Sequence, residues 1–366
     1  MLYLDNAATT PLSESTKKYI ISLLDEYGNP SSKYSMGESA KNMVEIARSE
    51  VSRFINANPE DIYFTSGGSA SNTMAIRGYV AKNECSILYS PIAHKSVIKC
   101  IESCNTKTTP IPVDNNGRII IEEFERLCLH EKKPFVVIDY VNSEVGVVQN
   151  LKRIVDIAHL YNGVVYVDCT ASISTIPMDV QKFRVDMCGF SGHKLGSLKG
   201  VGVLYKTRGI SIEPLIYGTQ ENGLIGGTEN TIGIATLGRV LSNYKYEKSS
   251  FARDYVYGYI SGNIADSYLV GSMESRVVHN LYMCFRGVDS ESLMLLLDLS
   301  DIQVSTGSAC NSNEVTPSHV LKEISINEKD IYSCIRMTFS GNETKEDLDY
   351  LCEKLKFCVG QLRDVN

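Results

Sequence analysis

Short runs of hydrophobic residues alternate along the chain with longer segments in which hydrophobic positions recur every three or four residues. Six short runs have the length and composition of strands: Ile62–Phe64, Ser86–Tyr89, Pro134–Val141, Gly163–Asp168, Met187–Phe190 and Gly200–Tyr205. Five longer segments have helical spacing: Glu38–Phe54, Ala70–Val80, Lys95–Ser103, Ile120–Leu129 and Leu151–Tyr161. Several strands are hydrophobic at consecutive positions, which is typical of parallel strands covered by helices on both faces. The pattern therefore predicts an α/β domain with a mostly parallel sheet.

The pattern changes after about residue 245. A predicted helix over Glu229–Tyr244 leads into the polar stretch Glu247–Arg253. The elements that follow are more widely spaced: strands at Asn280–Phe285, Gln303–Ser305 and Ile335–Phe339, and helices at Ser290–Asp298 and Lys345–Leu362. Thr344 and Asp347 form a capping-box-like start for the last helix. We therefore expect a large domain over residues 13–250, and a smaller α+β domain formed by residues 1–12 and 251–366.

Composition and charge narrow the classes of function. The 366 residues carry a formal net charge of −7, and no run of basic residues suggests a nucleic acid or an anionic membrane as a partner. The first residues lack the basic start and the hydrophobic run of a signal peptide, and no hydrophobic stretch approaches the ~20 residues of a membrane span. The eleven cysteines are scattered and include no C-x-x-C pair, so neither a disulfide framework nor a metal site is expected. These features predict a cytoplasmic globular protein.

Candidate chemistry lies where the predicted strands end, because parallel α/β sheets bind ligands at the carboxyl ends of their strands. Gly67, Gly68 and Ser69 follow the first strand and begin a helix, which suits a phosphate group, although an ordinary glycine turn has the same pattern. Asp168 ends another strand, and Lys194 follows the next one. Burial lowers the pKa of a lysine, which favours Schiff-base formation. A lysine and a carboxylate are the two groups that a pyridoxal phosphate site requires.

Two further residues stand in unusual surroundings. His94 follows the strand Ser86–Tyr89 and begins a helix, so it is either a simple cap or a residue that stacks on a cofactor ring and moves protons. Cys310 stands among small, polar, turn-forming residues, and we expect it on an exposed loop. The ordinary role of a cysteine as a small buried hydrophobe suits Cys188 or Cys284 better, since both lie inside hydrophobic runs.

These motifs, in this order, resemble those of cysteine desulfurases of the NifS/IscS type, which are pyridoxal phosphate enzymes of fold type I in the class V aminotransferase family. The resemblance covers nearly the whole chain. It rests on these segments: Tyr3–Pro11, Gly28–Ser32, Phe64–Gly67, Ser191–Lys194, Gly227–Thr228, Ser305–Cys310, Pro317–Leu321 and Ile335–Arg336. It implies a large α/β domain with a mostly parallel sheet flanked by helices, and a smaller α+β C-terminal domain that carries the catalytic cysteine.

The resemblance also implies a role for each matching residue. Lys194 would bind pyridoxal 5'-phosphate covalently, Asp168 would hold its ring nitrogen protonated, and His94 would stack on the ring. The phosphate would be held by Gly68, Ser69, Ser191 and His193, with Thr228 reaching in from a second subunit. Arg336, Asn6 and Asn142 would bind the substrate, and Cys310 would be the nucleophile.

The activity implied is that of a homodimer which converts L-cysteine to L-alanine and leaves the sulfur on Cys310 as a persulfide. An acceptor protein in iron–sulfur cluster assembly or tRNA thiolation would then take the sulfur. Selenocysteine lyase is the alternative within the same fold. A homologue that binds the cofactor without turnover is the alternative from another class. It is motivated by Ala171, Ser143 and Ile225, which stand where this family usually has glutamine, asparagine and arginine. Tyr34 likewise stands where a histidine is common.

Overall fold

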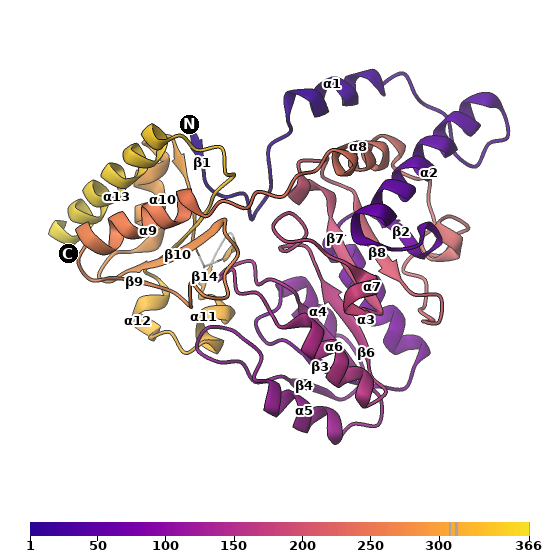
Figure 1. Cartoon of the computed structure of the whole chain (residues 1–366), viewed down its shortest axis with the longest axis horizontal. Helices are drawn as coiled ribbons and strands as arrows, with labels where there is room; N and C mark the ends of the chain where they lie inside the picture. Colours follow the sequence, from indigo (N-terminus) through magenta and orange to yellow (C-terminus); the bar gives the residue numbers. More distant parts are fainter. Residues whose placement is uncertain (307–308, 312–313, 366) are drawn as a thin grey trace.

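The computed structural model describes residues 1–306, 309–311 and 314–365, with the backbone alone described at 309–311, 314–316 and 365. Figure 1 shows two parts side by side, one built around a large sheet and one that carries the C-terminal helices. The first strand, β1 (Leu2–Tyr3), lies with the C-terminal helices, although it begins the chain. The N-terminal segment therefore passes from one part to the other.

The larger sheet has seven strands. Their spatial order is β2 (Ile62–Thr65), β8 (Gly202–Lys206), β7 (Met187–Ser191), β6 (Val164–Asp168), β5 (Pro134–Asp139), β3 (Ser86–Tyr89) and β4 (Thr108–Pro110). Strand β8 is antiparallel to both neighbours, and the other pairs are parallel. In β5, Phe135 and Val137 belong to the core on one face, while Val136 and Ile138 belong to the core on the other. Burial of both faces explains the consecutive hydrophobic positions, and the predicted parallel α/β architecture is confirmed.

Helices cover both faces of this sheet. On one face the core includes residues of α2 (Ser35–Ile55), α5 (Ile121–Leu129), α6 (Leu151–Leu160) and α8 (Thr231–Ser242). On the opposite face the core includes residues of α3 (Gly68–Lys82) and α4 (Lys95–Glu102). The short helix α7 (Val180–Phe183) precedes β7, and α1 (Glu14–Ser22) lies near α8 at the edge of this part. Helices α3 and α4 begin directly after the ends of strands, which directs their N-termini toward one edge of the sheet.

The second part is built on a smaller antiparallel sheet. Its strands follow the order β12 (Ser305–Thr306), β15 (Cys334–Thr338), β10 (Asn280–Phe285) and β9 (Ser267–Leu269). One core joins this sheet to α9 (Phe251–Asn263), α10 (Ser290–Asp298), α13 (Lys345–Val365) and Leu4. A separate core contains residues of α11 (His319–Glu323) and α12 (Glu328–Ile331). Strand β1 pairs with β11 (Ile302–Gln303), and β13 (Ala309–Asn311) pairs with β14 (Glu314–Thr316).

Most predicted elements are present, and their ends account for most of the differences. The predicted strand Pro134–Val141 ends at Asp139, because the chain then bends and Val141 forms an isolated bridge with Val148 instead of pairing with a strand of the sheet. The predicted segment Gln303–Ser305 is split between β11 and β12, which belong to different sheets. The capping box is confirmed, since the backbone N–H of Thr344 donates to Asp347 and the backbone N–H of Asp347 donates back to Thr344.

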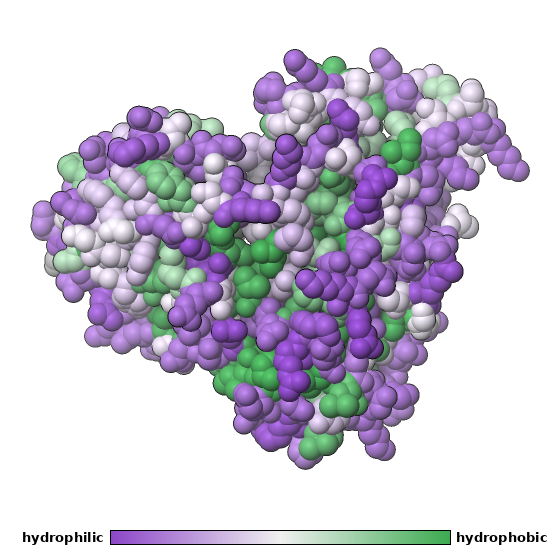
Figure 2. All heavy atoms as spheres, in the orientation of Figure 1, coloured by the Kyte–Doolittle hydropathy of each residue, from purple (hydrophilic) through white to green (hydrophobic). Residues whose placement is uncertain are grey.

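The core that contains Leu4 also contains residues from Ala252 to Val359. The division into residues 13–250 and residues 1–12 with 251–366 stays a prediction. Figure 2 shows a largely polar face with hydrophobic residues gathered toward its middle. Among the described residues, no helix has the length and hydrophobicity needed to span a membrane.

Candidate active site

A cavity of about 470 Å³ lies where strands β5, β6 and β7 end. Its walls come from these strand ends, from the first residues of α3 and α4, from the N-terminal segment and from β15. Eight of the residues predicted from the sequence line it: Gly68, Ser69, His94, Asp168, Ser191, His193, Lys194 and Arg336. The structure thus brings together residues that are as much as 268 positions apart in the chain (from 68 to 336).

Lys194 lies in a short 3-10 turn (Gly192–Leu195) directly after β7, so the strand fixes its position at the cavity. Its Nζ donates hydrogen bonds to the backbone oxygens of Ala7 and Ala8, the second at 2.7 Å. Burial, followed by the nearby positive charge of Arg336, lowers the pKa of Lys194 to about 8. A larger fraction of this amine than of an ordinary lysine is therefore unprotonated near neutral pH, and the unprotonated form is the one that acts as a nucleophile or a base.

Asp168 is the last residue of β6 and is only 5% exposed. Its Oδ2 accepts a hydrogen bond from the side-chain amide of Asn72 at 2.9 Å, and its Oδ1 accepts one from the backbone N–H of Thr170 at 2.8 Å. The same amide of Asn72 donates to Ser96 Oγ at 2.9 Å, and its oxygen accepts from the hydroxyl of Tyr166. This network holds a buried carboxylate in one orientation at the edge of the cavity, where it can face a cation.

His94 is the N-cap of α4. Its Nδ1 accepts a hydrogen bond from the backbone N–H of Ser96 at 3.1 Å and lies 2.7 Å from Ser96 Oγ. The ring is therefore both a cap and a wall of the cavity, so the two roles left open by the sequence are not exclusive. The protein around the ring desolvates it and lowers the pKa of His94, while the charge of Asp168 acts in the opposite direction. At neutral pH the ring is uncharged.

The first turn of α3 forms a cradle that suits an anion. The helix begins at Gly68 after Gly67, whose φ of +149° few residues other than glycine adopt. A Cβ atom added to Gly68 would lie 2.7 Å from Thr170 Oγ1, so only glycine fits without displacing that side chain. Thr170 Oγ1 is itself buried and has no hydrogen-bond partner among the described residues. Free backbone N–H groups at a helix N-terminus and an unpaired hydroxyl are donors that a phosphate group can use.

Arg336 reaches the cavity from β15 of the smaller sheet, and its side chain is almost buried. One terminal nitrogen donates to Asp5 Oδ1 at 2.6 Å, and the other donates to the backbone oxygen of Ser143 at 3.0 Å. Its Nε is buried and has no partner among the described residues. The guanidinium is thus oriented by two neighbours and can bind a carboxylate in the cavity.

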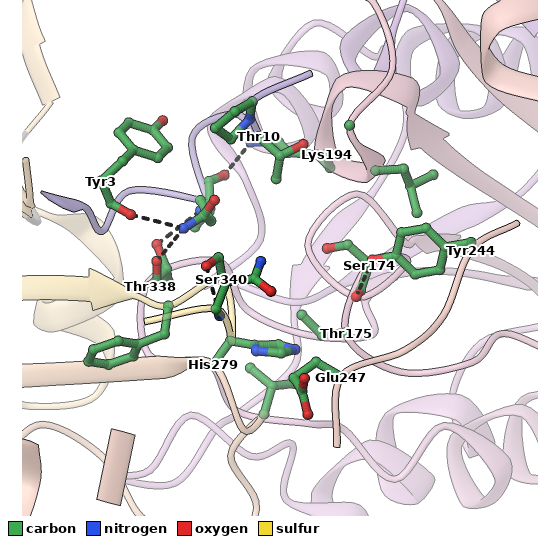
Figure 3. Close-up of a pocket in the computed structure, with 18 of the residues that line it drawn as sticks. Tyr3, Thr10, Ser174, Thr175, Lys194, Tyr244, Glu247, His279, Thr338 and Ser340 are labelled. Atoms are coloured by element: carbon green, nitrogen blue, oxygen red, sulfur yellow. Dashed lines mark hydrogen bonds between the residues drawn. The ribbon is translucent and has the colours of Figure 1, made fainter. Parts of the chain in front are cut away.

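A second cavity of about 910 Å³ adjoins the first. Figure 3 shows that its labelled residues come from the N-terminal segment, the loop after β6 and the segment around Tyr244 and Glu247, among others. Lys194, Ala171 and Ser143 line both cavities. Two of the positions at which the chain departs from the family pattern, Ala171 and Ser143, therefore line the same two cavities as the lysine.

Three of the remaining residues predicted from the sequence, Asn142, Asn6 and Thr228, do not line the first cavity. The fourth is Cys310. Asn142 is buried and lines the second cavity, and its amide donates to Ile92 O at 2.7 Å while its oxygen accepts from the backbone of Glu144 and Val145. Asn6 lines the second cavity and donates to Thr338 O at 2.8 Å. Thr228 is exposed and lines neither cavity. For Cys310 the structure describes the backbone in β13, paired with Val315, and its side chain lies outside the described part.

Sequence reasoning missed several residues of the first cavity. Asn72 lies on α3, one helical turn after the cradle, and its spacing from Ser69 could have drawn attention to it. Asp139 ends β5 in register with Asp168, and burial raises the pKa of its carboxyl group. Glu144 accepts a hydrogen bond from Ser318, and burial raises the pKa of this carboxyl group as well. His319, beside Ser318, contacts Ala93 O through Nε2 at 2.9 Å. Nothing in the local sequence indicates that these partners meet.

The fold and the cavity together define a class of protein: a mostly parallel α/β sheet with a lysine and a carboxylate at neighbouring strand ends. Comparison with known proteins identifies the family. The model of the aminotransferase class-V family matches residues 2–351, and the chain belongs to this family. The resemblance found in the sequence is confirmed.

Relatives and solved structures agree with this assignment. A protein of Dictyoglomus turgidum named cysteine desulfurase IscS is 34% identical over all of this chain and 96% of its own length. A protein of Archaeoglobus fulgidus named cysteine desulfurase IscS 1 is also 34% identical, over all of this chain and 99% of its own. A solved NifS-like protein has a TM-score of 0.89 and 29% identity, covering 98% of this chain and 99% of its own. The predicted fold class is thereby confirmed.

Proposed function

We propose that this protein is a pyridoxal phosphate-dependent cysteine desulfurase that converts L-cysteine to L-alanine. The observation that carries the proposal is the meeting of Lys194, whose pKa is lowered to about 8, with the buried Asp168 at one cavity. The names of relatives that match the full chain at about one third identity support cysteine as the substrate. A solved structure described as SspA in complex with cysteine, 28% identical over 94% of this chain, supports it further.

The described residues fit pyridoxal phosphate. The cradle at Gly68 and Ser69, with the unpaired hydroxyl of Thr170, would hold the phosphate, and Ser191 and His193 complete the same wall. Lys194 would hold the aldehyde carbon, Asp168 the ring nitrogen and His94 the ring face. When bound, the cofactor supplies an electron-withdrawing ring that makes the α-proton of an amino acid acidic.

The residues of the chain then have separate tasks. Arg336, oriented by Asp5 and Ser143, binds the carboxylate of the substrate with its guanidinium group. Lys194 Nζ, largely deprotonated above its depressed pKa, accepts the proton from the substrate's α-carbon. Asn72 and the backbone of Thr170 donate hydrogen bonds to the side chain of Asp168 and hold it in one orientation at the cavity. A carboxylate in this position can keep a proton on a ring nitrogen.

Cys310 is proposed as the sulfur carrier on the grounds of its sequence motif. Its thiolate attacks the sulfur of the substrate, forming an S–S bond while the C–S bond breaks. The electron pair of the broken bond stays on carbon, which takes up a proton and becomes the methyl group of alanine. The persulfide on Cys310 then passes its outer sulfur to an acceptor, for which we propose a protein of iron–sulfur cluster assembly or tRNA thiolation.

A homodimer is proposed because Thr228, which belongs to a matching motif, is exposed and lies away from the cavities of its own chain. In a dimer it would reach the phosphate cradle of the partner. A reducing, cytoplasmic location is proposed from the scattered cysteines of the sequence. Co-expression of Lys194→Ala and Thr228→Ala chains tests the dimer, because the mixed dimer regains one complete site and therefore measurable activity.

The proposed reaction is tested by incubating the purified holoenzyme with L-cysteine. Alanine and, in the presence of a reductant, sulfide should form in equal amounts, and the peptide that contains Cys310 should gain the mass of one sulfur atom. Cys310→Ser should abolish the sulfide while the bound cofactor keeps its absorbance. Cys85→Ser is the matched control and should behave as the unaltered enzyme.

The same experiment separates the alternatives. A rate with L-selenocysteine far above that with L-cysteine would favour selenocysteine lyase. Bound cofactor without alanine from either substrate would support a homologue that does not turn over. Undiminished sulfide release from Cys310→Ser would show that another group receives the sulfur.

A further inference from the structure

Asp139 is a buried carboxyl group of the first cavity to which the proposed function assigns no task. It is the last residue of β5, it lines the cavity, and it is only 4% exposed. Neither of its side-chain oxygens has a hydrogen-bond partner of acceptable geometry among the described residues. Buried polar groups in folded proteins are almost always paired, so an unpaired one calls for an explanation. Because Asp139 lines the cavity, a bound ligand can supply the partner.

Asp168 occupies the neighbouring position and differs in its contacts. Strands β5 and β6 are parallel and Asp139 is in register with Asp168, so the two residues end adjacent strands about 4.8 Å apart. Asp168 accepts a hydrogen bond from the amide of Asn72 at 2.9 Å and one from the backbone N–H of Thr170 at 2.8 Å. Asp139 accepts none from the described residues. The cavity therefore has two adjacent carboxyl groups, and the protein supplies donors to only one of them.

A buried carboxyl group that receives no hydrogen bond keeps its proton more readily than an exposed one. Removing a carboxylate from water without a compensating donor or cation costs far more than burying the neutral acid. Burial raises the pKa of Asp139, and the charge of Asp168 acts in the same direction. The nearby polar groups of Ser90 and Asn142 act in the opposite direction, but neither of these side chains carries a charge.

Two basic side chains on the same cavity wall are engaged elsewhere. Lys194 Nζ donates to two backbone oxygens of the N-terminal segment, and His94 Nδ1 accepts a backbone N–H of α4. Neither forms a hydrogen bond with Asp139. On the β3 side, the hydroxyl of Ser90 is buried and also has no partner of acceptable geometry among the described residues. The acid proton of Asp139 is therefore free to be donated to a ligand.

The cofactor of the proposed function has one ring oxygen to which no residue has been assigned. The cradle of α3 would take the phosphate, Lys194 the aldehyde carbon and Asp168 the ring nitrogen. The phenolic oxygen remains, on the ring carbon next but one to that nitrogen, and Asp139 is the strand end next to Asp168. We propose that Asp139 is a protonated acid that donates a hydrogen bond to the phenolic oxygen of pyridoxal phosphate. This inference rests on the proposed function and adds a binding residue to its site.

The ligand test titrates the full-length, cofactor-free protein with pyridoxal phosphate and with 3-deoxypyridoxal phosphate, which lacks the phenolic oxygen. Asp139→Leu replaces the acid by a hydrophobic side chain and should weaken binding of pyridoxal phosphate roughly tenfold to a hundredfold. The affinity of this variant for the deoxy analogue should stay within about twofold of that of the unaltered protein. Asp139→Asn keeps an N–H donor and should lose less affinity for pyridoxal phosphate than Asp139→Leu.

The protonation of Asp139 has a readout that needs no cofactor. In cofactor-free protein made with aspartate that carries ¹³C in its side-chain carboxyl group, the infrared spectrum at pH 7 should contain the C=O band of a protonated labelled acid. Asp139→Asn should remove this band. Asp186→Asn, at the opposite end of the sheet, is the matched control and should keep it. Thermal unfolding of each variant establishes that it is folded.

The outcomes separate this proposal from the proposed function. Absence of the protonated-acid band, equal weakening of both ligands by Asp139→Leu, or undiminished affinity of Asp139→Leu for pyridoxal phosphate would overturn the donor role and leave cofactor binding intact. Failure of the unaltered protein to bind pyridoxal phosphate would overturn the proposed function and the donor role with it.

Discussion

Two lysines lie at opposite ends of the same strand pair, and they show what makes a buried lysine functional. Lys194 follows β7, whereas Lys206 ends β8 opposite Met187 at the beginning of β7. Burial lowers the pKa of both amines. Lys206, however, donates to Thr207 O at 3.2 Å and to Ile210 O at 2.9 Å, and it lines neither cavity. Burial alone therefore does not mark a functional lysine. A functional lysine is buried at the carboxyl edge of the sheet, where the parallel strands end, and it also lines a cavity.

Two histidines, one at the amino edge of the sheet and one at the carboxyl edge, show the same difference as the two lysines. At the amino edge, His159 Nε2 lies 2.9 Å from Asp186 Oδ2, and that carboxylate also accepts the backbone N–H of Val165. At the carboxyl edge, His94 uses Nδ1 for its helix cap and its ring lines the cavity. The amino edge pairs its polar groups with each other, and the carboxyl edge leaves some of them for a ligand.

The largest expected effect comes from substituting each of the two lysines in a variant of its own. Lys194→Ala should reduce turnover of L-cysteine by roughly 10²–10⁴-fold, because the base and the cofactor anchor are both lost. Lys206→Met should leave turnover within about twofold, since its amine has only structural hydrogen bonds. Initial rates and the absorbance of the bound cofactor measure both. An equal loss of activity in Lys206→Met would remove the distinction between the two edges.

The second prediction concerns the carboxylates at the two edges. Asp168→Asn removes the charge that would face the ring nitrogen and should weaken cofactor binding about tenfold to a hundredfold. Asn72→Ala, which removes the donor that positions Asp168, should have a smaller effect of the same kind. Asp186→Asn is the control at the amino edge. Equilibrium titration of cofactor-free protein with pyridoxal phosphate measures the affinities, and equal weakening in all three variants would argue against a special role of Asp168.

The sequence was sufficient for six of the seven strands of the larger sheet, and it was insufficient for β4 and for the partners around the site. Strand ends are visible in a sequence, so Asp168, Lys194 and the glycines of the cradle could be found there. Asn72, Asp139 and the contact of Arg336 with Asp5 depend on how separate elements pack. Such contacts leave no local pattern because each residue by itself is ordinary for a helix, a strand end or a turn.

The split of the segment Gln303–Ser305 between two sheets has a similar cause. Its hydrophobic pattern predicts one strand, but β11 pairs with the N-terminal β1 and β12 pairs with β15. The partner strands lie about 300 and 30 residues away in the sequence, respectively (Leu2 to Ile302, Ser305 to Arg336). A window of local sequence contains neither of them.

The third prediction uses the pKa of Lys194. Only the free amine reacts with an acylating reagent, so labelling of Lys194 in cofactor-free protein should rise with pH through a midpoint near 8. Arg336 lowers this pKa and Asp5 raises it. Arg336→Gln should therefore move the midpoint to higher pH and slow labelling at pH 7 a few-fold, and Asp5→Asn should move it to lower pH. Pulse labelling with mass analysis gives the midpoints. A midpoint near that of a solvent-exposed lysine would contradict the assigned desolvation.

The smallest effect compares two glycines, one at the cradle and one in a helix of the second part. Gly68→Ala places a Cβ atom 2.7 Å from Thr170 Oγ1, so the hydroxyl must move away from the anion site. We expect inorganic phosphate to bind a few-fold more weakly, with a stability loss of about 1 kcal/mol. A Cβ atom on Gly258 in α9 meets nothing within 4 Å, and Gly258→Ala should stabilise the protein by about 0.5–1 kcal/mol without changing phosphate binding. Calorimetric titration and denaturant unfolding measure the two quantities. If Gly68→Ala lowered stability but kept the phosphate affinity, the close packing there would serve the fold, and the anion site would have to use other donors.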